Sequence, residues 1–133
     1  MVIERIIAWA IRDPRKLFLI DGAGAILTIV LLGYILVELA GFFGIPVRAL
    51  NVLVILPCLY LVFDLYCLLR KQIDFRLCLK VIASLNLFYC VLAVGSAFYF
   101  SDELTIFGWL FVTSECAVII VLSTLEFRVA RLV

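Results

Sequence analysis

Histidine is absent from the sequence, and its absence excludes several kinds of site. Histidine-ligated haem, histidine-based zinc sites and hydrolase nucleophiles activated by histidine all need an imidazole. Charged residues are scarce as well: they make up 16% of the 133 residues, and the formal net charge is +1. Such a chain has no basic face suited to nucleic acid. We therefore expect no metal site, no cofactor and no nucleic-acid partner.

Motifs that carry catalytic chemistry are also missing. The five cysteines form no Cys-x-x-Cys and no Cys-Cys pair, and no dinucleotide or phosphate-binding glycine loop follows a strand pattern. The three lysines, Lys16, Lys71 and Lys80, lie at the ends of the long apolar stretches, which excludes a Schiff-base lysine deep in the membrane. We therefore predict that the protein is not an enzyme. An intramembrane thiol or aspartyl enzyme ranks last among the functions considered.

Apolar residues dominate what is present. They account for 68% of the chain, whereas soluble domains contain about 45–50%, and the mean hydropathy is +1.31. A transmembrane helix needs about 20 mostly apolar residues. Four stretches qualify: Leu17–Leu39, Leu50–Leu69, Leu77–Phe100 and Leu104–Phe127. The sequence therefore predicts an all-α membrane protein, in which residues 1–133 form one transmembrane domain with an up-and-down antiparallel bundle of four helices.

The connections between these stretches contain turn residues. Gly44 and Pro46 interrupt the first connection. The third connection is only Ser101-Asp102-Glu103, where we expect Ser101 to cap the last helix and the two acids to lie at its N-terminus.

Lysine and arginine are distributed unevenly between the two predicted sides of the membrane. Arg48 alone falls on one side. The other ten are Arg5, Arg12, Arg15, Lys16, Arg70, Lys71, Arg76, Lys80, Arg128 and Arg131. Basic residues concentrate on the cytoplasmic side of membrane proteins. We therefore expect both termini to be cytoplasmic, in the inner (cytoplasmic) membrane of a bacterium.

The first thirteen residues have an amphipathic pattern. Glu4, Arg5 and Arg12 share one helical face, and the opposite face carries isoleucines. With Trp9, this pattern predicts a short helix in the headgroup layer. The alternatives are a helix that binds a partner and a continuation of the first span, although Asp13-Pro14 is a natural break between the two.

Each predicted span contributes one polar residue at membrane depth. These candidate site residues are Asp21, Asp64, Asn86 and Glu115. At 1.5 Å per residue they lie about 6, 8, 13 and 18 Å from the cytoplasmic ends of their helices. Polar groups at such depth are costly and indicate either an ion or proton pathway or an interhelical polar network. Asp21 and Asp64 are shallow enough to pair with Lys16, Arg70 or Lys80, whereas no basic residue shares the depth of Glu115.

Four further residues are weaker candidates for the same pathway or network. Tyr60 could bond a carboxyl group across helices, as could Tyr89, and Glu126 is expected at the cytoplasmic interface. Cys58 and Cys90 fall at one level near the midplane, together with Cys116. Buried thiols are most often small hydrophobic groups. Pro57 frees the carbonyl of Leu53 and could kink the second span.

Two functions remain open at this point. The first, slightly favoured because the chain has no extramembrane domain, is a non-catalytic accessory or assembly subunit of a membrane complex. The second is a small homo-oligomeric channel or carrier for protons or small cations that uses the intramembrane carboxyl groups. The expected partners are the lipid bilayer and either further copies of the chain or another membrane subunit.

Overall fold

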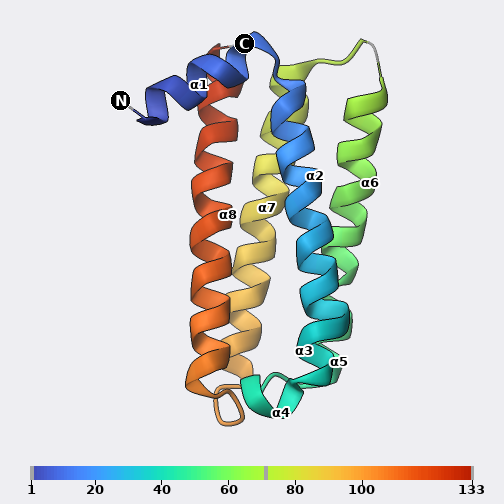
Figure 1. Cartoon of the computed structure of the whole chain (residues 1–133), viewed down its shortest axis with the longest axis vertical. Coiled ribbons are helices and arrows are strands. Elements are labelled where there is room, and N and C mark those ends of the chain that lie inside the picture. Colours follow the sequence, from blue (N-terminus) through green and yellow to red (C-terminus); the bar gives the residue numbers. More distant parts are fainter. Residues whose placement is uncertain (1, 71, 133) are drawn as a thin grey trace.

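The computed structural model describes residues 2–70 and 72–132, so Met1, Lys71 and Val133 lie outside the described residues. The described part contains helices and no strands. Four helices are long and apolar enough to cross a membrane: Arg15–Glu38, Val47–Leu69, Phe75–Tyr99 and Ile106–Leu132. The predicted fold class, an all-α membrane bundle, is confirmed (Figure 1).

The first two spans contain local irregularities, and the last two are continuous. The first is α2 (Arg15–Val30), a π-helical turn η1 (Leu31–Ile35) and α3 (Leu36–Glu38). The second is α5 (Val47–Leu53) and α6 (Ile55–Leu69), and the third and fourth are α7 (Phe75–Tyr99) and α8 (Ile106–Leu132). The break between α5 and α6 precedes Pro57 by three residues, because proline has no N–H to donate to the Leu53 carbonyl.

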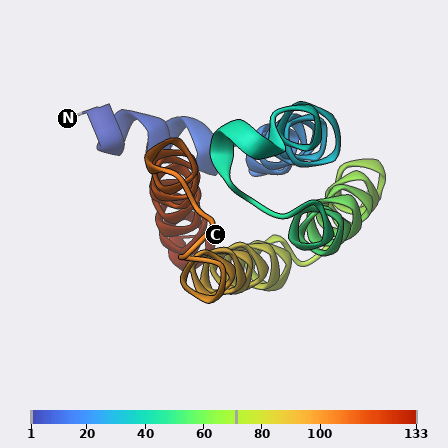
Figure 2. The ribbon, with the colours of Figure 1, turned by 90° about the horizontal axis from the view of Figure 1, so that it is seen from below.

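The four spans form an open arc rather than a closed bundle. Helix α2 packs along α6, and α7 packs along α8, while α6 and α7 join the two pairs more loosely. Seen along the bundle, α2 and α8 stand at the two ends of the arc (Figure 2). Exposed apolar side chains cover the outward faces of all four spans, as expected for helices surrounded by lipid.

The ends of the bundle that are remote from the termini are tied together by α4 (Ala40–Phe43). Gly44 follows α4 with a φ of 74°, the left-handed conformation typical of a glycine after a helix. Thr105 donates its N–H to the Phe43 carbonyl at 3.1 Å and its hydroxyl to the Phe42 carbonyl at 2.7 Å. We call the region of α4, its following loop and the start of α8 the outer cap.

The expected capping role of Ser101 is wrong. Ser101 lies in a turn, and α8 begins only at Ile106. Thr105 caps α8 instead, since its hydroxyl oxygen accepts a hydrogen bond from the Gly108 N–H at 3.3 Å. Helix α8 starts two residues later than the predicted apolar run, which begins at Leu104. At this position the Thr105 side chain can hydrogen-bond both the Phe42 carbonyl of α4 and the Gly108 N–H of α8.

Both termini lie at one end of the bundle, and the amphipathic helix α1 (Val2–Arg12) crosses that end (Figure 1). It packs against α8 with Ala10 buried, while Ile3 and Trp9 remain exposed. A break follows α1, where the Asp13 carboxylate accepts a hydrogen bond from the Arg15 N–H at 3.2 Å. Helix α1 is therefore not a continuation of the first span.

The predicted orientation has a direct test. We expect green fluorescent protein fused after Val133 to fluoresce, because it folds in the cytoplasm. We expect alkaline phosphatase fused after Asp102 to be active, because it folds only outside. Fluorescence and phosphatase activity in whole cells measure the two positions. A fluorescent fusion after Val133 together with an inactive phosphatase fusion after Asp102 would place both positions on the same side and contradict the expected four-span topology.

Candidate functional site

The side-chain amide of Asn86 on α7 links two carboxyl groups from other helices. It donates to Asp21 Oδ1 on α2 at 2.7 Å and to Glu126 Oε1 on α8 at 3.2 Å. Both amide hydrogens of Asn86 are used in this way. A single asparagine therefore connects three of the four spans.

Asp64 on α6 completes this group. Its side chain lies against α2 beside Gly22, the residue that follows Asp21, and close enough to Asp21 and Glu126 for electrostatic interaction. Helix α2 approaches closely here, since a Cβ on Gly22 would lie 3.6 Å from the Asp64 Cβ. Asp64 and Glu126 are fully buried, and Asp21 is 5% exposed. We call Asp21, Asp64, Asn86 and Glu126 the carboxyl cluster.

The carboxyl cluster contains more acceptors than donors. Three carboxyl oxygens have no hydrogen-bond partner within the described residues: both oxygens of Asp64 and Oε2 of Glu126. Among the described residues, neither Asp21 nor Asp64 forms the expected pair with Lys16, Arg70 or Lys80: Lys16 lies over the Trp9 ring, and Arg70 over the Tyr66 ring. Carboxylates without a cation are costly at membrane depth. A protonated carboxyl group would supply the missing donor, so this group is chemically suited to hold protons.

Glu115 lies apart from the carboxyl cluster. Its Oε1 accepts a hydrogen bond from the Tyr89 hydroxyl at 2.9 Å, which joins α8 to α7. Tyr60 donates to the Leu85 carbonyl and not to a carboxyl group. The structure thus brings three of the four candidate residues together and leaves Glu115 with its own partner.

Glu126 faces the interior of the bundle. Its side chain is fully buried against Asn86. Helix α8 continues to Leu132, five residues beyond the predicted end of the span. The expected position of Glu126 at the cytoplasmic interface stays a prediction.

A cavity of about 310 Å³ connects the carboxyl cluster with Glu115. Residues from all four spans line it: Asp21, Gly24, Ala25, Leu27, Thr28, Leu31, Pro57, Tyr60, Asn86, Tyr89, Phe111, Ser114, Glu115, Val118, Ile119 and Leu122. Asp21, which is bonded to Asn86, lies six residues from the start of α2, and Glu115 lies nine residues from the start of α8 at the outer cap. We call this space the intramembrane cavity.

The intramembrane cavity has its mouth where exposed side chains of α2 and α8 line it, and these two helices stand at the ends of the arc (Figure 2). Leu27 on α2 is 60% exposed and Val118 on α8 is 68% exposed, and both line the cavity. Because these helices face lipid, the mouth opens sideways towards the bilayer.

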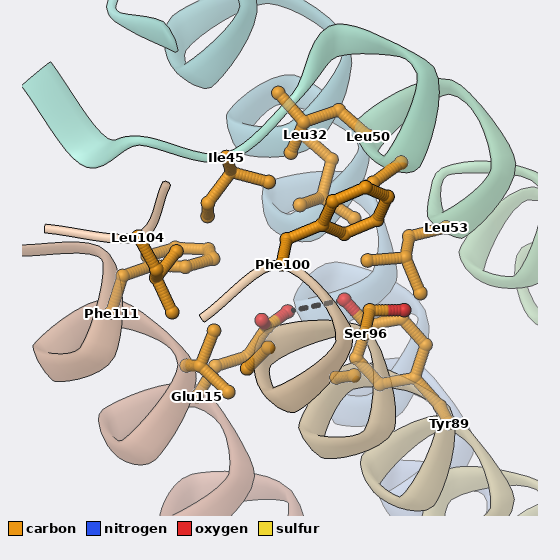
Figure 3. A pocket seen from close by; sticks show the side chains of 14 residues that line it. Leu32, Ile45, Leu50, Leu53, Tyr89, Ser96, Phe100, Leu104, Phe111 and Glu115 are labelled. Carbon is orange, nitrogen blue, oxygen red and sulfur yellow. Dashed lines mark hydrogen bonds between the residues drawn. The ribbon is translucent and has the colours of Figure 1, made fainter. Parts of the chain in front are cut away.

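Apolar side chains close the other side of Glu115. A void of about 20 Å³, room for about one water molecule, lies between Glu115 and the outer cap (Figure 3). Ile45, Phe100 and Leu104 lie above it (Figure 3). Glu115, Tyr89 and Phe111 line both this void and the intramembrane cavity. These three side chains therefore lie between the two spaces.

Comparison with known proteins gives no relative. No family model, no curated protein and no solved structure matches the chain. The roles of these residues therefore have to be argued from the carboxyl cluster, the intramembrane cavity and the charges around them. In the part of the chain that the structure describes, no group of three or more histidine, cysteine, aspartate or glutamate side chains has the arrangement of a metal site.

The candidate cysteines do not meet at one place. Cys90 and Cys116 contact each other's backbone carbonyl oxygens, with S···O distances of 3.9 and 4.0 Å, and thereby pack α7 against α8. Cys58 is exposed on α6. None of the three lines the intramembrane cavity.

Removing the Asn86 amide tests the carboxyl cluster as a structural unit. We expect Asn86→Leu to lower stability by about 1–3 kcal/mol, because two interhelical hydrogen bonds are lost and each contributes about 0.6–1.7 kcal/mol. Thermal unfolding in detergent, followed by circular dichroism, measures the change. Asn51→Leu is the matched control, since Asn51 is exposed on α5. Equal stability of the two variants would show that the amide does not hold the helices together.

Proposed function

We propose that the protein is a small integral membrane carrier that takes up protons on buried carboxyl groups and moves them across the bilayer. One observation carries the proposal: the intramembrane cavity connects the carboxyl cluster with Glu115. Sequence alone slightly favours an accessory subunit. The cavity favours transport, because a purely structural network needs contact between its polar groups and no space beside them.

The polar groups form a sequence of steps from the termini towards the outer cap. Asp21 lies six residues into its span, about 9 Å at 1.5 Å per residue. From the carboxyl cluster the path continues through the intramembrane cavity, which is large enough for several water molecules at about 30 Å³ each. It ends at Glu115 and the Tyr89 hydroxyl. Carboxyl groups, hydroxyl groups and water are all able to pass protons on.

The closed outer cap favours a carrier over an open channel. Beyond Glu115 lies the void of about 20 Å³, which Phe100, Leu104 and Ile45 line. A proton on Glu115 reaches the other side only when these side chains separate. Access from the two sides then alternates, as in a carrier.

Proton flux in liposomes tests the proposal. Purified protein is reconstituted into vesicles that contain a pH-sensitive dye, and a pH difference is applied with valinomycin and potassium to balance charge. We expect the pH difference to decay faster than in protein-free vesicles made from the same lipid. Decay at the protein-free rate would overturn the proposal.

An accessory role is the second candidate, and the open mouth between α2 and α8 favours it. A helix of another subunit lying there would cover the exposed Leu27 and Val118. Native mass spectrometry of the protein from its own membranes in mild detergent separates the candidates. A stoichiometric foreign subunit supports the accessory role, whereas a homo-oligomer or a monomer with lipid supports a function of this chain itself.

A further inference from the structure

We propose that the intramembrane cavity binds a lipophilic amine, with an apolar body in the cavity and a positively charged head on Glu115. The inference rests on the proposed function, since the carboxyl group that takes up protons is also the one that receives the amine. Three features support it: the hydrogen-bonding state of the cavity wall, its apolar lining and its sideways opening.

The tyrosine and asparagine donors on the cavity wall are already occupied. Tyr60 donates to a backbone carbonyl of α7, and Tyr89 donates to Glu115 Oε1. Both amide hydrogens of Asn86 are used within the carboxyl cluster. The second oxygen of Glu115 receives no hydrogen bond from the described residues. A cavity wall with a free carboxyl oxygen suits a ligand that donates hydrogen bonds. A cationic donor suits it best, because a hydrogen bond between charged groups is stronger than a neutral one.

The rest of the lining suits an apolar body. Leu27, Leu31, Val118, Ile119 and Leu122 supply aliphatic surface. The volume of about 310 Å³ lies at the lower end of the range of small-molecule sites, about 300–1,000 Å³. Tyr60, Tyr89 and Phe111 also line the cavity, and aromatic side chains are frequent in sites that bind organic cations. A small aliphatic or arylalkyl amine therefore matches the cavity in size and chemistry.

The position of the mouth explains how such a ligand arrives. A neutral amine dissolves in the bilayer and reaches the mouth between α2 and α8 without passing through water. Its nitrogen lone pair takes the proton of the Glu115 carboxyl group: the O–H bond breaks as the N–H bond forms. The product is an ammonium–carboxylate pair with the same total charge. The proton therefore stays in the complex with the amine, and departure of the neutral amine returns it to the Glu115 carboxyl group.

Binding of 4-phenylbutylamine tests the inference, with 4-phenylbutanol as the uncharged comparison. The protein is placed in phosphatidylcholine nanodiscs, and the binding of each tritiated compound is corrected for empty nanodiscs. We expect the amine to bind at least about tenfold more tightly than the alcohol, because a charge-assisted hydrogen bond is stronger than a neutral one. Equal affinity of amine and alcohol would overturn the inference.

Variants locate the site. Glu115→Gln is expected to reduce amine affinity to that of the alcohol, and Val118→Trp to weaken both compounds by filling the mouth. Glu38→Gln is the matched control, because Glu38 is exposed at the far end of the first span. The Glu38→Gln protein should bind both compounds as the wild type does. Undiminished binding in Val118→Trp, or in a folded Glu115→Gln protein, would place the ligand elsewhere and contradict the inference.

The two proposals fail in different ways. Proton flux without preferential amine binding would overturn the ligand and leave the proton carrier standing. Amine binding that depends on Glu115, in a protein without proton flux, would overturn the carrier and leave the binding site standing.

Discussion

Glutamine in place of Glu115 is expected to reduce proton flux in liposomes by at least about tenfold. Its amide oxygen still accepts the hydrogen bond from Tyr89, which in the wild type is 2.9 Å long, so the contact between α7 and α8 is retained. The amide cannot gain or lose a proton under these conditions. The dye assay on Glu115→Gln vesicles measures the effect at equal protein content.

A control separates loss of the proton site from a general loss of charge. Glu38→Gln removes one carboxyl group of the same kind from an exposed position, and its flux should equal that of the wild type. If Glu115→Gln conducts as well as Glu38→Gln, then Glu115 serves only as an acceptor for Tyr89. In that case Glu115→Leu should loosen the bundle while Glu115→Gln is silent.

Alanine at Gly44 or Gly108 is expected to cost more than about 2 kcal/mol of stability, because both glycines lie against backbone of the outer cap. A Cβ on Gly44 would overlap the Glu103 carbonyl oxygen, and its φ of 74° costs any other residue about 1–2 kcal/mol. A Cβ on Gly108 would overlap the Phe43 carbonyl oxygen. Backbone atoms cannot turn aside as a side chain does. Thermal unfolding in detergent measures the loss.

Gly95→Ala provides the matched control for both substitutions. Gly95 lies within α7, and apart from its chain neighbours and the backbone of its own helix, no described atom lies within 4 Å of the position that an alanine methyl group would take there. Alanine at this position should therefore leave stability unchanged or raise it by up to about 1 kcal/mol. A similar loss in all three variants would indicate a general intolerance of alanine. The close packing of the outer cap would then not be the cause.

The sequence was sufficient to predict the fold class. Hydropathy and length decide whether a segment crosses a membrane, and neither depends on how helices pack. The end of a helix depends on partners as well. Thr105 replaces Ser101 as the cap because its hydroxyl also reaches the Phe42 carbonyl, a contact between segments 63 residues apart.

The sequence indicates most of the residues of the candidate site, but it does not indicate which of them contact one another. Asp21, Asp64 and Asn86 stand out because a polar group within a span is costly. Their grouping with Glu126 depends on how four helices are rotated and shifted relative to one another, which helical periodicity alone does not determine. The hydrogen bond from Asn86 to Glu126 spans 40 residues, and no local sequence pattern indicates it.

The central claim is that the buried carboxyl groups hold and exchange protons. Infrared spectroscopy of the reconstituted protein measures this directly, because a protonated carboxyl group has its own C=O stretching band. At neutral pH we predict such a band, its shift in D₂O and its partial loss in Asp64→Asn. A spectrum with only ionised carboxylate bands at neutral pH, unchanged by Asp64→Asn, would contradict the account.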